Sequence, residues 1–198
     1  MLAIQDVGDF KNKVIKKRTK KRQILLIDTQ RRVEDYFNKL KYRNNKKYDQ
    51  IPHFIITKLG VVYKLNKCEY SSNIFYDNKL DKRMIVIAIE NLGWLTKNPI
   101  NGIFNNWIGD TYRGNPYTKE WREKYYWDPY TNEQVKTISE LCNKVCEDYN
   151  IEKNIPISNG FFENTSKFKG ILCKSNFSTI YTHINPSFNF KNIFKNDK

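Results

Sequence analysis

The sequence predicts an α/β (α+β) protein of a single domain, in which helices flank a central mixed β-sheet. Two unbroken apolar runs, QILLID at residues 23–28 and MIVIAIE at residues 84–90, have the length and composition of strands buried on both faces. Apolar side chains recur at helical spacing after the first run and again after Thr131. With 198 residues and 39% hydrophobic content, the chain can bury one sizeable core and fits one domain better than two.

The first 22 residues are predicted to form a basic N-terminal arm, and residues 23–198 to form the domain itself. The stretch at 11–22 reads KNKVIKKRTKKR and has no periodic apolar face. Such arms are usually mobile until a partner orders them. The arm could contact DNA or a neighbouring subunit, or it could be a solvated tail. Its candidate partner-binding residues are Lys16, Lys17, Arg18, Lys20, Lys21 and Arg22.

The first part of the domain reads as a strand, a helix and a hairpin. The strand at 23–28 is followed by Thr29, which can cap a helix whose apolar face carries Val33, Tyr36, Phe37 and Leu40. Residues 53–57 (HFIIT) and 61–65 (VVYKL) are β-branched and aromatic, and the loop between them contains Gly60, which can adopt the left-handed conformation. The run at 84–90 then predicts a central strand.

The second part begins with residues 91–130, where the periodicity disappears. We expect a long irregular insertion pinned by its aromatic side chains, Trp94, Trp107, Trp121 and Trp127. Thr131 and Gln134 match a capping box, and the apolar residues that follow predict a helix. The tail at 155–190 is predicted to be loop-like with short extended pieces.

The net charge is +14, from 35 Lys and Arg against 21 Asp and Glu. It would suit a phosphate backbone, an anionic cell wall or an acidic protein partner. However, the chain is also rich in Asn, Ile, Tyr and Phe, as a coding sequence poor in G and C would make it, and Lys belongs to the same set. The charge therefore says little about nucleic acid in particular.

The four cysteines include no CxxC pair and no secretory leader precedes them, which favours a reduced intracellular setting. Cys142 and Cys146 are four residues apart on the predicted second helix and could share a metal, but core-facing thiols are the commoner case. No apolar run approaches the roughly 20 residues that a membrane span needs. These features predict a soluble protein made in the cytoplasm of a bacterial host.

The order of strand, helix, hairpin, central strand, insertion, helix and tail resembles that of type 2 N-acetylmuramoyl-L-alanine amidases, the zinc fold shared with peptidoglycan-recognition proteins. LLIDTQRRVEDYFNKLK resembles the first strand and helix, IPHFIITKLGVVYKL the hairpin, and VIAIENLGWL the strand after it. Four further segments resemble the form of this fold encoded by tailed phages of gut bacteria: NWIGDTYRG, WREKYYWDPYT, FKGILCKSNF and THINPSFNF. Together these segments cover nearly the whole chain after residue 22.

The resemblance implies three zinc-ligand positions, and in this chain they hold Ile27, Asn159 and His183. Isoleucine has no lone pair to offer, and an Asn carbonyl is a weak neutral donor better suited to hard cations. The tyrosine that assists the transition state in the family corresponds to Pro52, which has no hydroxyl. His53 and Glu90 are retained, in roles that the resemblance leaves open. We therefore expect no catalytic residue, no metal site and no cofactor.

A rebuilt zinc site is the alternative. Asp28, Cys173 and His183 are all acceptable zinc ligands by their chemistry. Against this set, Asp28 follows the ligand position by one residue in a strand, so its side chain should point to the opposite face.

The functional expectation is a catalytically inactive amidase-fold protein that serves as a structural component of a phage virion, as a tail, ring or portal-proximal subunit. Its partners would be other virion proteins, in a homo-oligomeric ring, with DNA contacted by the basic arm. The alternative is an active zinc-dependent N-acetylmuramoyl-L-alanine amidase, acting on peptidoglycan as an endolysin or virion-associated hydrolase. A third hypothesis is a module that binds the cell wall without hydrolysing it.

Overall fold

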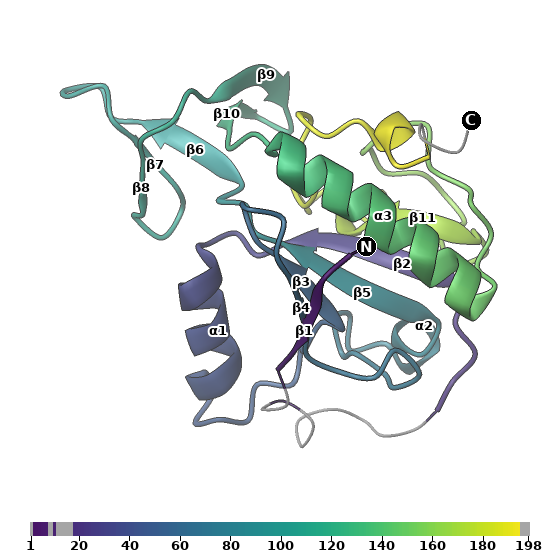
Figure 1. The fold of residues 1–198 in the computed structure, drawn as a ribbon. Coiled ribbons are helices and arrows are strands. Elements are labelled where there is room, and N and C mark those ends of the chain that lie inside the picture. Colours follow the sequence, from purple (N-terminus) through teal and green to yellow (C-terminus); the bar gives the residue numbers. More distant parts are fainter. Residues whose placement is uncertain (1, 8–9, 11–17, 195–198) are drawn as a thin grey trace.

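The computed structural model describes residues 2–7, 10 and 18–194, and within them it contains two β-sheets and three α-helices (Figure 1). The larger sheet has six strands. In order across the sheet they are β1 (Ile4–Asp6), β4 (Val62–Lys64), β3 (Phe54–Ile56), β5 (Met84–Ile89), β2 (Gln23–Asp28) and β11 (Gly170–Cys173). The helices are α1 (Val33–Tyr42), α2 (Asn78–Asp81) and α3 (Asn132–Tyr149).

The larger sheet is mixed and is covered by helices on both faces, as the sequence predicts. Strands β3, β5, β2 and β11 are parallel, and β4 is antiparallel to β3. In β2, Ile24 and Leu26 pack into the core beneath α3, whereas Leu25 and Ile27 pack into the core beside α1. Because successive strand residues face opposite sides, one continuous apolar run supplies both cores. Burial of each Leu or Ile side chain stabilises the folded state by about 1.5–3 kcal/mol relative to an exposed side chain.

Helix α1 begins without the predicted Thr29 cap. The Thr29 hydroxyl donates instead to the carbonyl of Arg31 at 2.6 Å. The backbone N–H of Val33, the first residue of α1, donates to the Glu90 carboxylate at 3.1 Å, and the backbone N–H of Lys58 donates to the other Glu90 oxygen at 2.8 Å. Glu90 therefore ties the start of α1 to the β3–β4 hairpin, which gives this retained acid a structural role.

The hairpin and the second predicted helix are confirmed. Gly60 has φ +75°, and a Cβ there would lie 2.7 Å from the Thr137 hydroxyl on α3, so the turn requires glycine for both conformation and space. Thr131 caps α3, and its capping box with Gln134 is complete. Cys142 and Cys146 are buried and unpaired in the core beneath α3.

The prediction of an irregular insertion at 91–130 was wrong. This segment forms a second, antiparallel sheet of five strands, which lies above the larger sheet in the view of Figure 1. Its strands are short and mostly exposed, which is why no buried alternation marks them in the sequence. In sheet order they are β8 (Thr111–Tyr112), β7 (Phe104–Asn105), β6 (Trp94–Lys97), β10 (Lys124–Trp127) and β9 (Tyr117–Trp121).

The tryptophan side chains of residues 91–130 differ in burial. Trp127 is fully buried, packs 5.4 Å from the Trp121 ring and donates its indole N–H to the carbonyl of Lys119. Trp107 is 49% exposed, so it does not serve as a core anchor. The expectation of aromatic anchoring therefore holds for Trp127 and not for Trp107.

Parts of the predicted arm are integrated into the fold. Strand β1 pairs with β4 at the edge of the larger sheet. The side chain of Lys21 is buried and donates to the carbonyls of Tyr70 at 2.6 Å and Lys82 at 3.1 Å, so it is not available to a partner. Arg18, Lys20 and Arg22 are exposed, and Lys16 and Lys17 lie outside the described residues. Among the helices that the structure describes, none is long and apolar enough to cross a bilayer.

Candidate functional site

A cavity of about 220 Å³ lies at the carboxyl ends of the parallel strands β2 and β11. The strand register pairs Leu26 with Cys173, so the next residues, Ile27 and Lys174, lie side by side where the strands end. Ligand sites of α/β proteins typically occur at this edge of a sheet. The cavity is lined by side chains from β2, α1 and the segments that follow β7 and β11, among them Ile27, Arg31, Lys39, Trp107, Lys174 and His183.

The structure brings two of the three predicted ligand positions together. Ile27 and His183 line this cavity, but Asn159 lines a separate cavity beside Trp121 and Pro186. The Asn159 amide donates to the carbonyls of Ile184 at 2.7 Å and Asn185 at 2.9 Å, so its side chain is engaged in loop packing. The residue that converges with Ile27 and His183 is Lys174, which sequence reasoning missed.

His183 presents a hydrogen-bond donor to the cavity. Its Nδ1 accepts the backbone N–H of Asp28 at 3.1 Å. In a neutral imidazole the proton then resides on Nε2. Burial, followed by the charges of Lys174 and Lys39, lowers the pKa of His183 to about 3, so the ring is neutral at pH 7. The ring nitrogen that is left for a ligand is therefore an N–H and not a lone pair.

The Asp28 carboxylate is already satisfied. It accepts the Tyr130 hydroxyl and, at 2.9 Å, the backbone N–H of Ile184. Burial raises the pKa of Asp28 to about 7, against the lowering effect of these two hydrogen bonds. Its side chain faces away from that of Ile27, as strand alternation requires.

Cys173 is a core thiol on the α3 side of the sheet. Its sulfur lies 3.2 Å from both the Ser175 hydroxyl and the Asn176 side-chain oxygen. Burial raises the pKa of Cys173 to about 12, so the group is a protonated thiol at neutral pH. The structure thus does not bring Asp28, Cys173 and His183 to one point, and the described part of the chain contains no group of three His, Cys, Asp or Glu residues that could hold a metal ion.

The residues at this edge of the sheet do not fit zinc. A catalytic zinc needs three lone-pair donors. Here the converging side chains are the aliphatic Ile27, the ammonium of Lys174 and the N–H of His183. The ammonium also repels a divalent cation.

The two other positions that the resemblance singled out are structural. Pro52 is buried and is not among the residues that line the cavity. His53 is fully buried, where its Nδ1 accepts the Val86 N–H at 2.8 Å and its Nε2 lies 3.1 Å from the Tyr70 carbonyl oxygen. Burial, followed by the charge of Lys21, lowers the pKa of His53 to about 3. It links two backbone segments in its neutral form.

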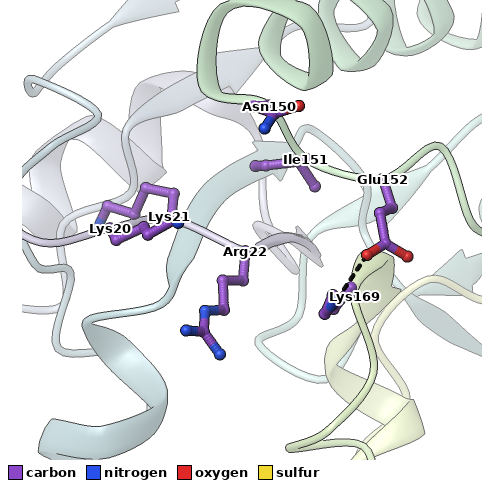
Figure 2. Close-up of a pocket in the computed structure, with 7 residues that line it drawn as sticks. All are labelled: Lys20, Lys21, Arg22, Asn150, Ile151, Glu152 and Lys169. Carbon is purple, nitrogen blue, oxygen red and sulfur yellow. Dashed lines mark hydrogen bonds and ion pairs between the residues drawn. The ribbon is translucent and has the colours of Figure 1, made fainter.

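Three cations of the predicted arm, the exposed Lys20 and Arg22 and the buried Lys21, lie at the opposite end of the parallel strands. Lys20, Lys21 and Arg22 line a cavity of about 400 Å³ at the amino ends of β2 and β11. Figure 2 shows Lys20 and Lys21 on one side of this cavity, and on the other side the ion pair between Lys169 and Glu152, 2.8 Å long. Because Lys21 and Lys169 are already bonded, the cations here do not converge on a common ligand.

A mixed sheet with helices on both faces and a cavity at the carboxyl ends of its parallel strands defines an α/β domain with a candidate ligand site at that edge. The sequence model of the family described as N-acetylmuramoyl-L-alanine amidase matches residues 18–183, and the chain belongs to that family. The family resemblance is therefore confirmed, while a phage origin stays a prediction.

Two solved structures share the fold. The N-acetylmuramoyl-L-alanine amidase LysC from Clostridium intestinale is 12% identical, with a TM-score of 0.60, and the match covers 98% of this chain and 96% of that chain. The endolysin amidase LysCS from the same organism is 13% identical, with a TM-score of 0.57, covering 98% and 94%. No curated protein sequence matches the chain. At these identities the similarity establishes the fold and not the activity.

Proposed function

We propose that this protein binds bacterial cell-wall peptidoglycan through the cavity at the carboxyl ends of β2 and β11. The observation that carries the proposal is the composition of that cavity. A half-exposed indole, Trp107, lies beside hydrogen-bonding groups and cations, with the Arg31 guanidinium 5.7 Å from the ring centroid. Aromatic faces suit sugar rings, and cations suit the carboxylates of a wall peptide. Membership of the amidase family supports the same substrate class.

A role at the cell wall has better support than a structural role in a virion. The family and the solved structures of similar fold are amidases, one of them an endolysin. A virion location, a homo-oligomeric ring and DNA contact by Arg18, Lys20 and Arg22 are separate proposals. They draw support from the altered ligand positions and the exposed cations.

The second candidate function is zinc-dependent hydrolysis of the bond between N-acetylmuramic acid and L-alanine. Family membership favours it. The chemistry of the cavity opposes it, because Ile27, Lys174 and His183 offer no set of zinc ligands. We therefore derive no catalytic step through a metal and favour binding without hydrolysis.

Sedimentation with purified, insoluble peptidoglycan tests the proposal. We expect the protein to sediment with the wall and the variant Trp107→Ala to do so several-fold less. Tyr125→Ala is a matched control, because Tyr125 is 53% exposed on β10 and does not line the cavity. Failure of the wild-type protein to sediment would overturn the proposal.

The same preparation distinguishes the second candidate. Hydrolysis at this bond frees the amino group of L-alanine, which can be quantified with and without one equivalent of zinc. Release that requires tightly bound zinc and stops with a chelator would establish the amidase activity in place of simple binding.

A further inference from the structure

Four cationic side chains line the cavity that contains Ile27 and His183. Arg31 follows β2, Lys39 and Arg43 belong to α1 and its C-terminal end, and Lys174 follows β11. Among the described residues, none of the four forms an ion pair with a carboxylate. Cations drawn from three separate segments thus surround one small space without an internal counter-charge.

Lys39 and Arg31 both lie against aromatic rings, and Arg31 has an unpaired polar atom. The Lys39 ammonium lies 5.5 Å from the Tyr36 ring centroid and 5.1 Å from that of Tyr48. The Nε of Arg31 is buried and has no hydrogen-bond partner. Buried donors in proteins are usually satisfied by protein atoms, ordered water or a bound ion.

Electrostatics agrees with this geometry. Burial, followed by the charges of Arg31, Arg43 and Lys174, lowers the pKa of Lys39 to about 8. The cations are therefore close enough to repel one another, and a bound anion would relieve that repulsion.

Lys174 and His183 also line this cavity. The Lys174 ammonium lies 4.5 Å from the Tyr181 ring centroid, and the Asp28 N–H at Nδ1 of His183 leaves the proton of the neutral ring on Nε2. The carboxylate of Asp28, the only acidic residue among those that line the cavity, is bonded to Tyr130 and Ile184. Burial lowers the pKa of Lys174, and the nearby Asp81 carboxylate opposes this effect. The oxygens of Asp81 already accept the backbone N–H groups of Phe75 and Asp77.

We propose that this cavity is an oxyanion site, in which Arg31, Lys39, Lys174 and the Nε2–H of His183 bind one phosphate or carboxylate group where the amidase family would hold a metal ion. The volume of about 220 Å³ leaves room for such a group. Charge-assisted hydrogen bonds from ammonium and guanidinium groups bind oxyanions more strongly than hydrogen bonds between neutral groups do. The inference does not require peptidoglycan binding, since any small oxyanion would serve.

Titration calorimetry of the full chain with inorganic phosphate at low ionic strength tests the site. We expect one equivalent to bind, and Lys174→Met to weaken the binding by about tenfold or more. Lys136→Met is the matched control, because Lys136 lies exposed on α3, and it should change the affinity by less than about twofold. Lys174→Arg, which keeps the charge, should retain most of the binding and also guards against loss of folding in the Met variant. No binding of phosphate or acetate, or equal weakening by Lys136→Met, would overturn the inference.

Two further binding experiments identify the source of the anion. A soluble disaccharide–peptide fragment of peptidoglycan carries carboxylates and no phosphate, whereas glycerol phosphate represents a phosphate-containing wall polymer. The compound that binds more tightly, and whose binding is weakened by Lys174→Met, identifies the source of the anion. Phosphate binding without sedimentation on peptidoglycan would sustain the oxyanion site and reject the proposed function; sedimentation without oxyanion binding would do the reverse.

Discussion

At the scale of single residues, hydrogen-bond direction decides what the cavity can bind. A lone histidine in an amidase fold suggests a surviving zinc ligand until its partner is known. Because the Asp28 backbone N–H occupies Nδ1 of His183, the ring offers an N–H at Nε2. The neighbouring position, Ile27, offers no polar atom, and Lys174 brings a positive charge. Three side chains therefore change the preference of the site from cations to anions.

Both histidines of the chain make folding sensitive to acid. His53 and His183 have pKa values of about 3 in the folded state, against an ordinary value of 6.5. The unfolded chain therefore binds more protons than the folded chain below pH 6.5, and stability is lost as pH falls from 6.5 towards 3. Each group contributes a slope of up to about 1.4 kcal/mol per pH unit within that window.

We predict that His53→Gln lowers the stability at pH 7 but flattens its dependence on pH between about 6 and 4. The glutamine amide can still reach the Tyr70 carbonyl but has no proton to gain. Urea unfolding at a series of pH values measures this, with the wild-type protein as the reference. An unchanged slope would show that His53 is not the buried neutral group described above.

At the scale of elements, the turn between β3 and β4 is fixed by its contact with α3. We predict that Gly60→Ala destabilises the protein by about 2–4 kcal/mol, since alanine would face both a left-handed backbone and a Cβ 2.7 Å from the Thr137 hydroxyl. Gly109→Ala is the matched control: Gly109 has φ +91°, and no atom lies within 4 Å of the point that an alanine Cβ would occupy. The Gly109→Ala variant should lower the free energy of unfolding by only about 1–2 kcal/mol. Equal losses in urea unfolding would mean that the hairpin does not pack closely on α3.

The register of β11 against β2 makes a second prediction at this scale. Residues that follow Leu26 and Cys173 lie next to each other at the strand ends, about 4.8 Å apart across neighbouring strands. We expect the double variant Ile27→His, Lys174→His to retain more zinc than Ile27→His alone, because it places two imidazoles at adjacent strand ends and removes one ammonium. Metal content after dialysis measures it, with Ile27→His alone as the control. Equal zinc content in the wild-type protein would contradict the assignment of Lys174 to this position.

At the scale of the whole molecule, the sequence predicted those parts whose side chains are buried. The runs at β2 and β5, the apolar face of α1 and the Thr131 capping box are all local signals of burial or helix initiation, and the structure confirms them. The second sheet was missed because its strands are exposed and carry no alternation. Lys174 was missed because its role depends on β11 pairing with a strand about 145 residues earlier, and such pairing is not encoded locally. A strand-like segment, ILC at 171–173, followed directly by a charged residue was the one available signal.

The N-terminal segment provides the last test, because it was predicted to be an arm and the structure integrates part of it. Phe10 is 1% exposed and stacks on Phe37 of α1, with ring centroids 6.2 Å apart, while Ile4 in β1 packs against the core beneath α3. We predict that Phe10→Ala lowers the free energy of unfolding by about 3–5 kcal/mol, the usual loss for a buried phenylalanine. Arg18→Ala, at an exposed position of the same segment, should change it by less than about 0.5 kcal/mol. Urea unfolding monitored by tryptophan fluorescence compares the two variants. If neither variant changed the free energy of unfolding, the first residues would behave as a separate arm and the central sheet would end at β4.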